Sequence, residues 1–256
     1  LFWNRRIRVR SVKNIVDEIA LLQEQYALDR MSFADDAMNI PQTRAFEICD
    51  EIIERGLHKK LEFFTLMRAD RKSVSFELFQ KMREANFQVV SLGIESASPR
   101  VLKAMEKSLT PEEASQAIQM ARKAGMIQVF GNFMVGNWDE GLRDILKTWY
   151  FVLSNKVMPL FWICTPYPGT EFSRSLMESG YQDSQYAWLT KIKPGAIIAI
   201  ARTNKMPIYL ITWVYWLSSL LSFAVLPFRA GELRIFKRYA RQALIELWRK
   251  LKTPKD

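Results

Sequence analysis

The chain has 256 residues, of which 49% are hydrophobic and 25% are charged, a composition that indicates a globular protein and excludes a low-complexity chain. Its net charge of +10 is uneven, because residues 229–256 carry nine Lys or Arg against three acids. The remainder is only weakly basic, so we expect no nucleic acid among its partners. The two cysteines, Cys49 and Cys164, are too few for a metal-ligand set and favour a reducing, cytoplasmic setting.

Apolar periodicity predicts an alternation of helices and strands along the chain. The first helix covers residues 12–26, with Ser11 as its N-cap. The five predicted strands cover residues 30–34, 61–66, 88–94, 128–135 and 158–164. Further helices are predicted from 43 to 56, after Ser75, from 110 to 125, from 139 to 154 and from 170 to 179. The clearest helix start is Thr110-Pro111-Glu112-Glu113, which combines an N-cap threonine, a proline at the first helical position and a capping-box glutamate.

This alternation requires a parallel sheet with right-handed crossovers. The predicted fold class is therefore α/β, an incomplete parallel βα barrel with an α-helical C-terminal appendage. We expect the first strand of the barrel to lie before Leu1. The expected organisation is a partial barrel over residues 1–180, a linker over 181–205 and the appendage over 206–256.

Polar or glycine-bearing segments follow each predicted strand, at the position where a βα barrel carries its chemistry. These segments are Asp35 and Asp36, Arg68, Glu95 and Ser96, Gly131 to Glu140, and Thr165 to Thr170. Together they predict one shared site. Two plainer interpretations stay open: the aspartate pair can serve a turn or a helix cap, and Arg68 can form a structural ion pair. The glycines permit close approach of a flat ligand, or serve turns.

In order and spacing, these segments resemble the radical S-adenosylmethionine (radical SAM) superfamily, in the branch whose members often carry an upstream cobalamin-binding domain. The similar segments begin with Arg8-x-Arg10-Ser11 and Phe33-Ala34-Asp35-Asp36. They continue with Arg68-Ala69-Asp70, Gly93-Ile94-Glu95-Ser96, Lys107 before Thr110, Gly131 through Gly136 to Glu140, and Pro166-Tyr167-Pro168-Gly169-Thr170. The resemblance runs from about residue 2 to residue 180.

The resemblance implies a SAM site at the barrel mouth. Asp35 and Asp36 would meet the amino group of SAM, and Arg68 its carboxylate. Glu95 and Ser96 would lie on the ribose side, whereas Gly136 and its neighbours, with Glu140 ending the motif, would line the adenine.

Two features depart from the family pattern. The Cys-x-x-x-Cys-x-x-Cys loop that binds the 4Fe-4S cluster is absent, and we expect its cysteines upstream of Leu1. In addition, Gly136-Asn137-Trp138-Asp139-Glu140 replaces the usual Gly-x-Pro-Gly-Glu. The chain by itself is therefore expected to be inactive.

The resemblance predicts part of an enzyme that reductively cleaves SAM for hydrogen abstraction or methyl transfer on a small-molecule or lipid-like substrate. It implies an electron donor for the cluster and cobalamin bound through an upstream domain. The alternative is a non-catalytic relative that uses the barrel as a binding or membrane-anchored assembly module.

The appendage suggests contact with a membrane. Residues 207–226 carry no charge, and a helix of that length spans about 30 Å, the thickness of a bilayer core. A basic amphipathic helix is predicted after Gly231. These segments favour a peripheral position on an anionic cytoplasmic membrane surface. The alternative is that the apolar segment is a buried helix packed against the barrel.

Overall fold

The computed structural model describes residues 8–167, 169–180 and 201–225. Its strands are β1 (Arg30–Phe33), β2 (Glu62–Arg68), β3 (Phe87–Glu95), β4 (Gln128–Val135) and β5 (Met158–Ile163). Its helices are α1 (Val12–Tyr26), α2 (Gln42–Glu54), the 3-10 helix η1 (Leu57–Lys59), α3 (Phe76–Glu84), α4 (Pro99–Ala104), α5 (Pro111–Lys123), α6 (Leu142–Asn155), α7 (Glu171–Glu178) and α9 (Ile208–Val225).

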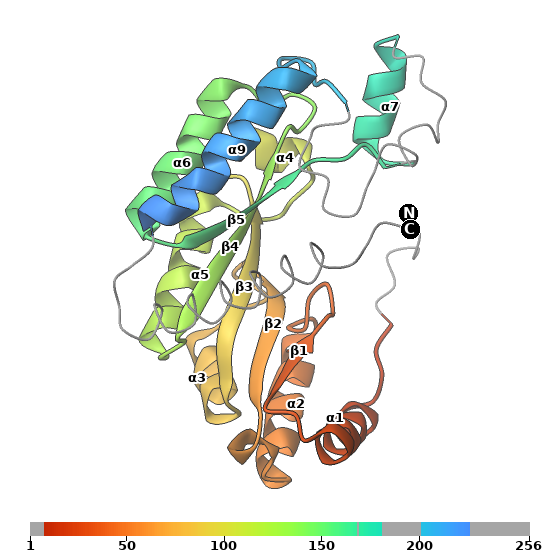
Figure 1. Ribbon diagram of the computed structural model, residues 1–256, viewed down its shortest axis with the longest axis vertical. Coiled ribbons are helices and arrows are strands. Elements are labelled where there is room, and N and C mark those ends of the chain that lie inside the picture. Colours follow the sequence, from red (N-terminus) through yellow and green to blue (C-terminus); the bar gives the residue numbers. More distant parts are fainter. Residues whose placement is uncertain (1–7, 168, 181–200, 226–256) are drawn as a thin grey trace, which may run out of the picture.

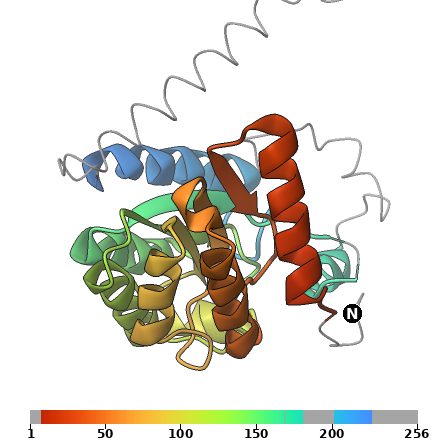
Figure 2. The same cartoon turned by 90° about the horizontal axis from the view of Figure 1, so that it is seen from below.

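The strands form one sheet in the order β1-β2-β3-β4-β5, and every neighbouring pair is parallel (Figure 1). Each crossover contains a helix, and the helices follow the outside of the sheet in an arc when the molecule is seen from below (Figure 2). The predicted α/β fold with a parallel sheet is therefore confirmed.

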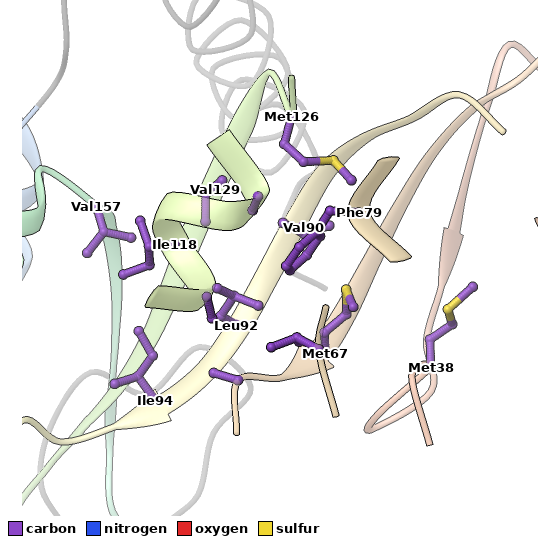
Figure 3. Close-up of a cluster of buried hydrophobic side chains, with 14 of the residues drawn as sticks. Met38, Met67, Phe79, Val90, Leu92, Ile94, Ile118, Met126, Val129 and Val157 are labelled. Carbon is purple, nitrogen blue, oxygen red and sulfur yellow. The ribbon is translucent and has the colours of Figure 1, made fainter. Parts of the chain in front are cut away.

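The core lies between the sheet and the helices on its outer face. On β2 this face carries Phe63, Thr65 and Met67, which are buried, whereas Phe64 and Leu66 on the other face are only half-buried. Figure 3 shows part of this core, where Phe79 of α3 and Ile118 of α5 lie against the strands. Three aromatic rings of β1, β2 and β3 pack together: Phe33, Phe63 and Phe87 have ring centroids 5.1–5.9 Å apart. The other face of the sheet is therefore the one available for a ligand.

The predicted helix starts are confirmed where a side chain caps the backbone. Ser11, Ser75, Thr110 and Thr170 each accept a hydrogen bond from a backbone N–H of the first turn, which satisfies a donor that the helix itself leaves unpaired. The capping box of Thr110 with Glu113 is present as predicted.

Two helices differ from the prediction. Helix α6 begins at Leu142 rather than at residue 139, because the Glu140 N–H donates to the Asn137 carbonyl at 2.9 Å and closes a turn first. Helix α4 was not predicted; it is short and begins with Pro99 in its first turn. The strands agree with the prediction to within two residues at each end.

Helix α9 packs on β5 and lies beside α6. Ile211 and Val214 join the hydrophobic core, and Trp149 of α6 donates its indole N–H to Ser218 at 2.8 Å. In the structure, α9 is therefore a helix packed against the sheet, as in the alternative given for this apolar segment. Among the described helices, none is both long and apolar enough to cross a membrane.

The opposite side of α9 is exposed and carries Tyr209, Trp213, Trp216, Leu217 and Leu220. The boundary of the appendage at residue 206 stays a prediction. In the structure, Ile211 and Val214 of α9 belong to the same hydrophobic core as the sheet. Most of the predicted linker and the basic amphipathic helix lie outside the described residues.

Candidate functional site

The carboxyl ends of the five strands lie along one edge of the sheet, because all strands are parallel and adjacent. Asp35 and Asp36 follow β1 and are exposed. Arg68 ends β2, Glu95 ends β3, and Gly136 follows β4. We call this edge, from Asp35 to Cys164 after β5, the rim.

Arg68 is half-exposed and is held by an ion pair. Its Nε donates to Asp70 Oδ2 at 2.7 Å, and Ser73 donates its hydroxyl to the same carboxylate. Although burial acts to raise the pKa of Asp70, the hydrogen bonds from Arg68 and Ser73 hold that pKa below its ordinary value. The side chain of Asn39, fully buried, donates to the carbonyl oxygens of Arg68 and Ser73 at 3.0 and 2.7 Å. The loop after β1 thereby fixes the end of β2.

Glu95 has a strained backbone and a cationic partner. Its φ is +70°, a left-handed conformation that is uncommon for a residue other than glycine. Lys107, after α4, donates from Nζ to Glu95 Oε1 at 2.7 Å. Gly93 leaves room for this pair, because a Cβ there would lie 3.1 Å from Glu95 Oε1 and 3.3 Å from Lys107 Nζ. Such strain at the end of a strand is typical of functional sites.

Ser96 turns away from the rim and into the protein. Its side chain is fully buried, and its Oγ lies 3.4 Å from Thr148 Oγ1 and accepts from the Ser98 N–H at 3.1 Å. Thr148 also accepts from the Ala97 N–H at 3.1 Å. The Ser96 hydroxyl thus ties the end of β3 to α6, and its predicted place on the ribose side stays a prediction.

Glu140 holds the loop after β4 through its carboxylate. One carboxylate oxygen accepts from the backbone N–H groups of Gly136 and Asn137, at 2.7 and 3.3 Å. Burial raises the pKa of Glu140 to about 7, although these hydrogen bonds act to lower it. Its other oxygen, Oε1, and the Asn137 amide nitrogen Nδ2 are buried without a hydrogen-bond partner. Two unsatisfied polar atoms in one loop indicate that this part of the rim is completed by water or by a ligand.

Gly136 is required where it stands. Its φ is +90°, and a Cβ at this position would lie 2.9 Å from Cγ2 of Ile211 in α9. The close approach that this glycine permits is therefore to a helix on the outer face. Gly131 similarly leaves room for the ring of Phe133, 2.8 Å from where its Cβ would be.

The two cysteines are unsuited to bind a metal as they stand. Cys164, half-buried after β5, donates its thiol to Asn137 Oδ1 at 3.5 Å, and Cys49 is fully buried in α2. Burial raises the pKa of both thiols to about 12, so both are protonated at neutral pH. Within the described residues, no group of three or more His, Cys, Asp or Glu side chains could hold a metal ion.

Comparison with known proteins decides the family, because residues 2–148 match the radical SAM superfamily. The chain belongs to the radical SAM superfamily. An uncharacterized methyltransferase of Pyrococcus horikoshii is 30% identical over 171 residues, which are 66% of this chain and 36% of that protein. The anaerobic magnesium-protoporphyrin IX monomethyl ester cyclase of Cereibacter sphaeroides is 30% identical over 200 residues, 77% of this chain and 32% of that enzyme. The chain thus spans about one third of the length of these relatives.

A solved radical SAM structure has the same fold. The radical S-adenosylmethionine methyltransferase TsrM from Kitasatospora setae, with cobalamin and a [4Fe-4S] cluster bound, superposes with a TM-score of 0.58 at 16% sequence identity. The superposition covers 66% of this chain and 32% of that one. The resemblance inferred from the sequence motifs is therefore confirmed at the level of the family and the fold.

Sequence reasoning missed several residues of this radical SAM rim. Asn39 belongs to no motif, and Asn137 stands in the Gly136-to-Glu140 segment without an assigned role. The hydrogen bonds of both depend on chain segments that the fold brings together. Lys107 is part of a motif in the sequence, but its partner Glu95 is known only from the structure. The expected contact of Glu140 with the cofactor stays a prediction, and the hydrogen bonds of this carboxylate to the loop backbone are a second role that the sequence does not indicate.

Proposed function

We propose that this chain forms the SAM-binding part of a radical SAM enzyme that acts on a small molecule by hydrogen abstraction or methyl transfer. The observation that carries the proposal is the rim itself, where charged groups from neighbouring strands and an unsatisfied loop stand side by side within a radical SAM fold. A 4Fe-4S cluster, with cysteine ligands upstream of Leu1, would supply the electron that cleaves SAM.

Within this proposal the charged residues bind the amino-acid end and the ribose of SAM. Arg68 would offer its guanidinium to the SAM carboxylate, since such charge-assisted contacts are strong and directional. The exposed Asp35 and Asp36 would meet the ammonium group. Glu95, already neutralised by Lys107, would accept from a ribose hydroxyl, because a carboxylate has lone pairs beyond those that one lysine uses.

The loop after β4 would read the adenine. Asn137 Nδ2 is a donor and Glu140 Oε1 is an acceptor when ionised, and both are buried without a partner. An adenine edge offers an amino donor next to a ring-nitrogen acceptor, which complements this pair. Gly136 would contribute to this adenine site by fixing the loop backbone. It leaves no space for the ligand, because Ile211 fills the place of a Cβ there.

Calorimetric titration of SAM into the cluster-loaded full-length protein tests this assignment. We expect Arg68→Ala and Glu95→Ala each to weaken SAM binding by about tenfold or more, since a charge-assisted hydrogen bond contributes on the order of 1.5–3 kcal/mol. Arg55→Ala is the matched control, because Arg55 is also ion-paired, with Asp17 at 2.6 Å, but follows α2 at the opposite edge of the sheet. Unchanged SAM affinity in both rim variants would refute the proposed site.

The same samples separate the enzyme from a non-catalytic binding module. Release of 5′-deoxyadenosine under reducing conditions supports the enzyme, whereas SAM binding without cleavage supports the module. Cobalamin in an upstream domain is part of the proposal, supported by the cobalamin bound in TsrM. An electron donor for the cluster is also proposed, on chemical grounds alone.

We also propose a peripheral contact with anionic lipid, which would suit a lipid-like substrate and a cytoplasmic enzyme. Its support is the exposed aromatic side of α9, with Trp213 66% and Trp216 43% exposed, since tryptophan favours the membrane interface. Liposome flotation should show weaker binding for the Trp213→Ser/Trp216→Ser variant, which leaves the packed side of α9 intact. Equal flotation of the variant and the unchanged protein, or flotation of neither, would exclude this side of α9 as the contact.

A further inference from the structure

The face of the sheet opposite the helices carries an exposed tryptophan. Phe161 of β5 packs against Phe133 in the core, with ring centroids 5.4 Å apart. Because side chains alternate along a strand, its neighbour Trp162 points to the inner face. Trp162 is 57% exposed there, so its ring is available to a ligand instead of filling the core.

A chain of hydrogen bonds across three strands holds this ring in place. Trp162 donates its indole N–H to Asn132 Oδ1 of β4 at 3.2 Å, and Asn132 donates from Nδ2 to Ser91 Oγ of β3 at 2.7 Å. Ser91 is only 1% exposed, which anchors the chain in the sheet. Since the indole N–H is already engaged, the ring can offer a ligand its π-face but not a hydrogen-bond donor.

The surroundings of Trp162 fit a flat apolar ring. The strand register places Met134 of β4 directly beside it, and Leu160 shares its face of β5. Both are half-buried apolar side chains, and neither β4 nor β5 contains a charged residue. An exposed aromatic ring that is fixed by a hydrogen bond at its N–H, next to apolar neighbours, favours offset stacking with another planar ring.

We propose that Trp162, positioned by Asn132 and Ser91, is the stacking platform for a planar conjugated ring of the substrate, on the inner face of the sheet below the SAM rim. The inference rests on the proposed function, because it names the substrate class of that same site. The platform lies on β5, whereas the proposed SAM contacts lie at the ends of β2 and β3 and in the loop after β4. A planar substrate ring would lie against Trp162 with its reacting carbon directed toward the rim.

The test uses the full-length, cluster-loaded protein and two probes of similar size, a free-base porphyrin and deoxycholate, a saturated polycyclic acid that is not flat and conjugated. Titration followed by porphyrin absorbance and fluorescence gives the affinity for the porphyrin, and displacement of bound porphyrin by deoxycholate gives the affinity for deoxycholate. We expect the porphyrin to bind clearly more tightly. Trp162→Leu should weaken porphyrin binding about tenfold or more, and Trp162→Phe should retain most of it. Tyr150→Leu, at an exposed aromatic residue of α6, is the control and should leave porphyrin affinity unchanged.

The positioning role of Asn132 has its own readout. Asn132→Leu should weaken porphyrin binding, and Asn132→Asp should restore most of it, because the carboxylate still offers an acceptor to the indole N–H. If Asn132 had only a structural role, Asn132→Asp would not restore porphyrin binding.

Three results would overturn the inference while leaving the SAM site intact. The first is a Trp162→Leu variant that binds porphyrin as tightly as the unchanged protein does. The second is a protein that binds SAM but does not prefer the planar probe. The third is a Trp162→Leu variant that loses as much affinity for SAM as for porphyrin. The last would assign the platform to the adenine. A protein that binds porphyrin through Trp162 but not SAM would instead refute the proposed function.

Discussion

At the ends of β2 and β3, the charged side chains of the rim are paired near the surface, whereas after β4 a carboxylate is buried without a cation. Arg68 with Asp70 and Glu95 with Lys107 can exchange partners when a ligand arrives, because each pair is partly open to solvent. Glu140 cannot, because it is 1% exposed and is bonded to backbone N–H groups. The rim therefore has an adjustable half, where charged side chains are paired near the surface, and a fixed half, where a buried carboxylate holds the loop backbone.

The pH dependence of folding tests the fixed half and should show the largest effect. Glu140 has a pKa of about 7 in the folded protein against an ordinary value of 4.5, so between these values the folded state binds more protons than the unfolded state. The free energy of unfolding should therefore fall as pH rises through this window, by at most about 3 kcal/mol. Below it, the contribution of Glu140 is fully retained.

Glu140→Gln should remove this loss, because the amide oxygen can still accept from Gly136 and Asn137 but the group does not titrate. Chemical denaturation of both proteins at pH 5 and pH 8 measures the difference, and other titrating groups cancel between them. If the two proteins lose the same stability between these pH values, Glu140 is not the buried group that titrates.

Gly136→Ala should have a smaller effect that separates backbone strain from crowding. The left-handed φ of +90° by itself costs on the order of 1–3 kcal/mol for another residue, and the new Cβ would also press on Ile211 at 2.9 Å. Gly56→Ala is the matched control, because Gly56 has a φ of +68° with no atom within 4 Å of its would-be Cβ.

Denaturation midpoints of both variants should show Gly136→Ala to be the more destabilising, and Ile211→Val should recover part of the difference. Equal losses at Gly136 and Gly56 would mean that α9 yields without cost. The fixed half of the rim would then be less rigid than the contacts of Gly136 suggest.

The sequence by itself determined the local elements and the family. Strand positions followed from apolar runs and helix starts from capping side chains such as Ser11 and Thr110, since both signals act within a few residues. The position of Arg68 and Glu95 at one edge also followed from the sequence, because a parallel βα alternation leaves no other arrangement for the strand ends.

Only the tertiary structure decided what each rim residue touches. Ser96 directly follows Glu95 but turns into the core toward Thr148, because the backbone strain and bulge at Glu95 redirect the chain. Gly136 meets Ile211, 75 positions later, and α9 packs on β5 although its sequence favours contact with a membrane over packing against the barrel. By sequence Trp162 is one apolar residue in a strand, and only the fold brings its indole N–H within hydrogen-bond distance of Asn132. Such contacts join segments distant in the chain, and local periodicity carries no information on which of two faces or partners a side chain will meet.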